Sequence, residues 1–111
     1  MTPGARVSAA IELFDAILGG EQAERALTRW ARASRFAGSK DRAAVRDLVY
    51  DAVRQRRSLA HKGGAETGRA TLAALLYGPE IDQLFCGDGH APEPLSAEEH
   101  ARLQTSLPAS D

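Results

Sequence analysis

The sequence predicts an all-α fold, a compact bundle of helices. Apolar residues recur at spacings of three and four along most of the chain, which is the periodicity of one helix face. Alanine and leucine dominate the apolar residues and β-branched residues are few, a composition that favours helix over sheet. Glycine pairs, or glycine followed by proline, separate the periodic segments and are typical of helix ends. A chain of 111 residues suits one such domain.

The first two helices are expected over residues 3–18 and 21–33. Each carries apolar side chains along one stripe. In the second helix this stripe includes Leu27 and Trp30, so we expect Trp30 in the core. A pair of glycines ends the first helix, and arginines in the last turn of the second suit the helix dipole.

A third, long helix is expected over residues 40–61, with Ser39 as its N-cap and two glycines after it. At about 1.5 Å per residue it would be about 33 Å long. On a helical wheel its buried face consists of Val45, Leu48, Val49, Ala52 and Leu59. Arg56 projects from this apolar side, so we expect it in a buried or interfacial ion pair with Glu12 or Asp15 of the first helix.

The remaining helices are shorter. A fourth is expected over residues 66–77, followed by a short turn as far as Phe85. Glycine and proline predict a loop over residues 86–94. The capping box that begins at Ser96 predicts a last short helix, which ends by Pro108.

These elements suggest two parts of unequal order. Residues 1–85 form the predicted helical domain, and residues 86–111 form a looser C-terminal tail of one loop and one short helix. No apolar run is long enough to span a membrane, and the first residues lack an apolar signal segment, so a cytoplasmic protein is expected. The single cysteine, Cys86, excludes an internal disulfide.

The charged residues are divided unevenly along the chain. Eleven of the fourteen Lys and Arg residues lie between Arg25 and Lys62, with only three acids, so this window has a formal charge of +8. The rest of the chain carries −9, and the net charge of −1 conceals this division. Clustered cations hold phosphate backbones whatever the net charge of the protein, so the window predicts nucleic-acid binding.

On the predicted helices the basic residues form two rows around a tyrosine, with Phe36 nearby. Arginine matches phosphate oxygens with a planar fork and stacks on unpaired bases. The predicted RNA-binding residues are Arg25, Arg29, Arg32, Arg35, Lys40, Arg42, Arg46, Tyr50, Arg54 and Arg57. A solvated face on which arginines happen to cluster remains the alternative. The three histidines and Cys86 lack zinc-ligand spacing, and no catalytic constellation is present.

The sequence pattern of residues 34–57 indicates a particular protein family more specifically than its basic charge does. These residues resemble the helix with the pattern Asp-Arg, Leu-Val-Tyr and Arg-x-x-Arg in the NusB-like N-terminal domain of the RsmB (Sun) family of rRNA cytosine-5 methyltransferases. The matching residues are Asp41, Arg42, Leu48, Val49, Tyr50, Arg54 and Arg57. Residues 5–18, 26–31 and 87–92 are also similar to alphaproteobacterial members.

The resemblance implies a NusB-like helical bundle that binds RNA, expected to be rRNA, as the accessory domain of a methyltransferase. The S-adenosylmethionine-dependent catalytic domain would follow in cis, with residues 86–111 as the linker toward it. The family's Gly-rich cofactor loop and its Pro-Cys and Thr-Cys motifs do not occur here. We therefore assign no catalytic or cofactor-binding residue, Cys86 included, and expect no methylation by this chain alone. S-adenosylmethionine belongs to the expected catalytic domain.

Two other functions stay open. A free-standing NusB-like factor for transcription antitermination or ribosome assembly would share the same fold. A helical domain whose basic faces only pack on an acidic partner would need no RNA. A Gly-rich loop and the two cysteine motifs in the downstream reading frame would distinguish the methyltransferase from the free-standing factor.

Overall fold

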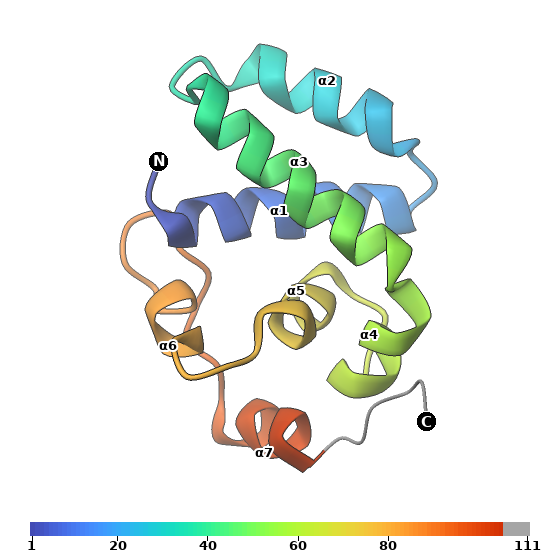
Figure 1. Cartoon of the computed structure of the whole chain (residues 1–111), viewed down its shortest axis with the longest axis vertical. Helices are drawn as coiled ribbons and strands as arrows, with labels where there is room; N and C mark the ends of the chain where they lie inside the picture. The colour runs from blue at the N-terminus through green and yellow to red at the C-terminus, as the bar shows by residue number, and fades with distance from the viewer. Residues whose placement is uncertain (106–111) are drawn as a thin grey trace.

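Helices account for the secondary structure of residues 1–105, the part of the chain that the structure, a computed structural model, describes (Figure 1). Within this part there are seven helices and no strand, which confirms the all-α class. The helices are α1 (Pro3–Leu18), α2 (Ala23–Ala33), α3 (Ser39–Arg54), α4 (Arg56–Gly63), α5 (Gly68–Leu76), α6 (Ile81–Leu84) and α7 (Ala97–Thr105). Across residues 1–105 no helix is long and apolar enough to cross a membrane.

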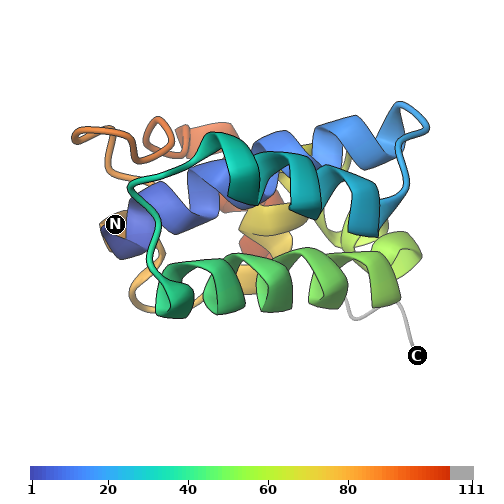
Figure 2. The same ribbon diagram turned by 90° about the horizontal axis from the view of Figure 1, so that it is seen from above.

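The first helix, α1, is the centre of the fold. It packs against α2, α3, α5 and α6. α2 and α3 run antiparallel beside each other, joined by residues 34–38, and both lie against α1 (Figures 1 and 2). Phe14 of α1 is fully buried together with Val45 and Val49 of α3, as the apolar spacing predicts. Trp30 is only half-buried at the edge of this core.

The predicted long third helix is wrong in one respect, because it is broken at Gln55. The backbone there has φ −110° and ψ 21°, and the chain continues in a new direction as α4. No glycine or proline marks this break. The change of direction allows α4 to pack against α5 and to bury Leu59. Burial of apolar surface therefore selects two helices over one straight helix.

The beginning of α3 also differs from the prediction. Ser39 is its first residue, and Gly38 is the N-cap. The backbone N–H of Gly38 donates to the carboxylate of Asp41, at 3.1 Å. The acid in the first turn thus satisfies the backbone N–H of the N-cap residue, which is the half of a capping box that an N-cap glycine can still form.

α5 confirms the predicted fourth helix, with Thr67 as its N-cap. The Thr67 hydroxyl accepts from the N–H of Ala70 at 3.1 Å. The N–H of Gly68 donates to Asp15 Oδ1 of α1 at 2.6 Å. Residue 68 is a glycine at the point where α5 meets α1, because a Cβ there would lie 2.8 Å from the same oxygen and closer still to the carbonyl oxygen of Ile11.

The C-terminal region is packed on the bundle as far as Thr105. The capping box holds the start of α7, since Glu99 N–H donates to Ser96 Oγ at 3.1 Å and Ser96 N–H donates to Glu99 Oε1 at 2.8 Å. Leu95 and Leu103 are buried in the same core as α1. Our expectation of a looser tail is therefore wrong for residues 95–105. The expected helix end at Pro108 lies outside the described residues.

Candidate nucleic-acid interface

Three acids that flank the basic window are brought onto it by the fold. Glu21 and Glu24 precede the window in sequence and Glu66 follows it. Each forms an ion pair with an arginine of the window, at 2.6 to 2.8 Å. Residues 21–66 contain eleven basic and six acidic residues, a formal charge of +5 rather than the +8 of the narrower window. Part of the apparent cationic surface is thus neutralised within the molecule.

Glu24 ties two of the predicted RNA-binding residues to α2. Arg46 Nη2 lies 2.6 Å from its carboxylate, and the Tyr50 hydroxyl donates to the same oxygen. The Arg46 guanidinium also lies 5.1 Å from the centre of the Tyr50 ring, a cation–π contact. The hydrogen bond from Tyr50, followed by that from Arg46, lowers the pKa of Glu24, and the bond to Glu24 raises the pKa of Tyr50. This cluster joins α2 to α3 across their exposed side.

Two further predicted residues are paired in a similar way. Arg29 binds Glu21 through Nε at 3.2 Å and Nη2 at 2.7 Å. This pairing lowers the pKa of the Glu21 carboxyl, chiefly through the hydrogen bonds from Arg29. Arg54 is paired with Asp51, one turn before it on α3. The carboxylates paired with Arg29 and Arg54 offset part of the positive charge that these arginines would offer to a phosphate.

The other predicted cations form no ion pair with any carboxylate of residues 1–105. Their side chains are all exposed. They are Arg25, Arg32, Arg35, Lys40, Arg42 and Arg57. Four of these six, Arg32, Arg35, Lys40 and Arg42, lie within eleven residues where α2 turns into α3, and we call this cluster the basic turn.

The one acid within the basic turn, Asp41, faces inward. Its carboxylate lies 2.8 Å from the Arg6 guanidinium and 3.4 Å from the Met1 amino group, and only 12% of its side chain is exposed. The hydrogen bond from Arg6, and next that from the Gly38 N–H, lowers its pKa. Because Asp41 is buried and paired, its charge does not oppose the four cations on the surface.

Phe36 stands between these cations. It is 70% exposed and is the exposed large hydrophobic residue of the described chain. In the same link Ser34 and Ala37 are buried, so the exposure of Phe36 is particular to its position. Sequence reasoning noted Phe36 but did not place it among the binding residues. The sequence feature that could have indicated an exposed, binding Phe36 is its position in a short connection between two helices, next to Arg35.

The groove beside the basic turn runs between α2 and α3. It has a volume of about 210 Å³. Arg42 and Arg46 line it from α3, and Thr28 and Ala31 line it from α2. The predicted residues Arg42 and Arg46 therefore line the same groove, although Arg46 is paired with Glu24.

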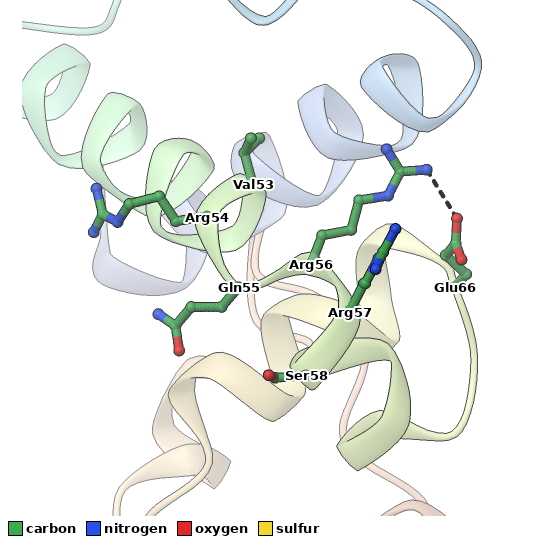
Figure 3. Close-up of a pocket in the computed structure, with 7 residues that line it drawn as sticks. All are labelled: Val53, Arg54, Gln55, Arg56, Arg57, Ser58 and Glu66. Atoms are coloured by element: carbon green, nitrogen blue, oxygen red, sulfur yellow. Dashed lines mark hydrogen bonds and ion pairs between the residues drawn. The ribbon is translucent and has the colours of Figure 1, made fainter. Parts of the chain in front are cut away.

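The break at Gln55 separates the remaining predicted residues. Figure 3 shows the pocket of about 580 Å³ at this break, where Arg54 points away from Arg56 and Arg57. Arg57 therefore does not continue the row of Arg46, Tyr50 and Arg54, because α4 has a different axis. Arg25, on the first half of α2, is exposed but lies away from the basic turn in sequence.

Arg56 corrects another prediction. It is exposed, and Nη2 binds Glu66 at 2.8 Å instead of Glu12 or Asp15 (Figure 3). The predicted partner Asp15 accepts the backbone N–H of Gly68. In a continuous helix Arg56 would lie on the same side as the buried residues of α3. The break at Gln55 changes the helix axis, so Arg56 no longer lies on that side.

The Gly-rich nucleoside loop of a Rossmann-like domain follows a strand and opens a helix, and residues 1–105 have no strand. The binding of S-adenosylmethionine therefore stays, as a prediction, with the expected catalytic domain. In the same part of the chain no three His, Cys, Asp or Glu side chains gather as a metal site.

Comparison with known proteins found no matching protein family, no matching curated protein and no matching solved structure. The resemblance of residues 34–57 to the NusB-like domain therefore stays a prediction.

Proposed function

We propose that this chain is an RNA-binding domain whose contact surface is the basic turn. The observation that carries the proposal is the grouping, around an exposed Phe36, of four cations that pair with no acid of residues 1–105, while the one acid of the same segment is turned inward. Such a surface attracts a polyanion through charge and offers an aromatic face to a base.

Single-stranded RNA suits this surface better than a duplex. Unpaired bases can stack on an aromatic ring or on a guanidinium plane, whereas the bases of a duplex are already stacked. Arg32, Arg35 and Arg42 supply planar forks for phosphate oxygens on either side of Phe36. The surface would therefore hold a short unpaired segment, with phosphates on the arginines and one base on the phenylalanine.

The family assignment is a further part of the proposal. Asp41 and Tyr50 of the resembling motif have intramolecular partners, so part of the motif serves the fold. Arg42 and Arg57 are the cations of the motif that form no ion pair within residues 1–105. We propose the accessory domain of a cytosine-5 rRNA methyltransferase, with the free-standing NusB-like factor as the alternative. A catalytic domain in cis would hold S-adenosylmethionine and transfer the methyl group, while this domain would hold the RNA.

Salt-dependent binding to a fluorescent 12-nucleotide single-stranded fragment of small-subunit rRNA tests the RNA proposal. With four phosphates neutralised, the logarithm of the affinity should fall by about 3 per decade of salt, at about 0.7 for each phosphate. Arg35→Gln combined with Arg42→Gln should reduce this slope by about 1.4. Phe36→Ala should lower the affinity about tenfold and leave the slope unchanged.

Two variants serve as controls. Arg56→Gln removes a cation that Glu66 already pairs, so the slope should stay the same. Glu24→Gln removes a negative charge beside Arg46 and should raise the affinity a few-fold, by roughly the energy of one surface charge contact. An affinity that ignores salt, or that falls equally in the Arg56 variant and in the basic-turn variant, would refute the proposal.

A further inference from the structure

A second surface adjoins the basic turn and shares Phe36 with it. It is an apolar groove between α1, α2 and the loop of residues 86–94. It has a volume of about 690 Å³. Ala5, Ala9 and Ala33 are among the small residues that line it, and Trp30 and Phe36 add two aromatic side chains. Small residues beside large aromatic ones leave space that an inserted side chain can fill.

The charges at the edge of this groove are negative. Glu12 of α1 and Asp88 of the loop line it, and neither forms an ion pair with any cation of residues 1–105. Arg29 at the same edge is neutralised by Glu21, and the amino group of Met1, which also lines the groove, lies 3.4 Å from Asp41. The groove therefore offers two uncompensated carboxylates around an apolar interior.

From this geometry we propose that the groove binds a short segment of another polypeptide, one with aliphatic side chains flanked by lysine or arginine. The aliphatic side chains would enter between Trp30 and the alanines, and the basic residues would meet Glu12 and Asp88. The two carboxylates favour a basic peptide over an acidic one, because opposite charges across an interface are attracted and like charges are repelled.

Two other occupants fit less well. RNA phosphates would be repelled by Glu12 and Asp88. A second copy of the chain would need an apolar side chain to insert, and among residues 1–105 the exposed large hydrophobic residue is Phe36, which belongs to the groove itself. The inference does not depend on RNA binding, because its charges are opposite to those of the basic turn.

A random 12-residue peptide library displayed on phage and selected against the whole chain tests this inference. The selection is repeated against a Ser8→Tyr, Glu12→Lys, Asp88→Lys variant, which narrows the groove and reverses its charge. Sequences enriched only on the unmodified chain should combine aliphatic residues with lysine or arginine. A Glu80→Lys variant is the matched control, since Glu80 is an exposed acid outside this groove.

Binding of the enriched peptide can then be measured at the groove itself. Trp30 is the only tryptophan in the chain and lines this groove, so its fluorescence reports on binding there. Trp30 also lines the groove beside Arg42 and Arg46, so the Glu12→Lys with Asp88→Lys variant assigns the change to the apolar groove. We expect a blue shift of emission, an affinity about tenfold weaker after Glu12→Lys with Asp88→Lys, and no change with Glu80→Lys. Acidic enriched peptides, equal enrichment on the triple variant, or no enrichment would overturn the proposal. Fluorescence changes that track protein concentration, with self-association in sedimentation, would assign the groove to a second copy and also overturn it.

Discussion

Replacing Gly68 with alanine tests the close packing of α5 on α1. The added Cβ would lie 2.8 Å from Asp15 Oδ1 and nearer still to the carbonyl oxygen of Ile11. Neither of these atoms is the end of a long flexible side chain. The helices must therefore separate, and the hydrogen bond from Gly68 N–H to Asp15 must lengthen beyond its 2.6 Å.

The expected cost follows from these two effects. Overpacking of a well-packed contact costs about 1–3 kcal/mol, and a lost hydrogen bond to a charged group adds about 1 kcal/mol or more. Alanine is better than glycine in a helix by up to about 1 kcal/mol, which opposes them. The free energy of unfolding should therefore fall by about 1–3 kcal/mol.

Guanidinium chloride unfolding, followed by circular dichroism, measures this change. Thermal unfolding should show a melting temperature lower by roughly 5–20 °C, at about 4–8 °C per kcal/mol for a domain near this size. Gly78→Ala is the control, because its Cβ would meet only the carbonyl oxygen of Leu76, at 3.9 Å. If Gly68→Ala were neutral or stabilising, as helix propensity alone predicts, the packing argument would be refuted.

Two further predictions concern the core and the C-terminal packing. The hydrogen bond from Arg69 lowers the pKa of Glu99 from its usual 4.5 to about 2, so the pair stabilises the fold above about pH 4.5 and the effect is lost as the pH falls toward 2. Glu99→Gln should therefore lower the free energy of unfolding by about 1–2 kcal/mol at pH 7, a figure reduced because the carboxylate is one-third exposed. At pH 2 the loss should be much smaller, as measured by urea unfolding at each pH. A difference that stays constant with pH would contradict this. Thr71 is buried, and its hydroxyl has no hydrogen-bond partner within residues 1–105, so Thr71→Val should raise the free energy of unfolding by about 1 kcal/mol. Thr67→Val, which removes the N-cap of α5, should lower it by a similar amount in the same assay, and a destabilised Thr71→Val would show that the hydroxyl is satisfied after all.

Several elements could be predicted from the sequence because their causes are local. Apolar spacing within α1 and α2 identifies their buried faces without knowledge of any other helix. The capping box at Ser96 defines the start of α7 from four consecutive residues. The glycine pairs end helices through their own backbone freedom, as Gly64 does with φ 78°.

Other features depend on residues far apart in the chain. Glu24 and Arg46 are 22 residues apart, and Arg6 and Asp41 are 35 apart. Neither pairing has a signature in the sequence. The charge count therefore overstated the free cationic surface, and the part of it that stays available became clear only once the partners of each side chain were known.

The sequence by itself determined that this protein is helical, where most of its helices lie, and that its basic residues are concentrated in one segment. Only the tertiary structure decided that the long third helix breaks at Gln55, that Arg56 turns outward to Glu66, and that Asp41 turns inward. The physical reason is the range of the interactions. Helix periodicity and capping act over a few residues, whereas burial against α5 and the pairing of charges act between helices that meet only in the folded chain.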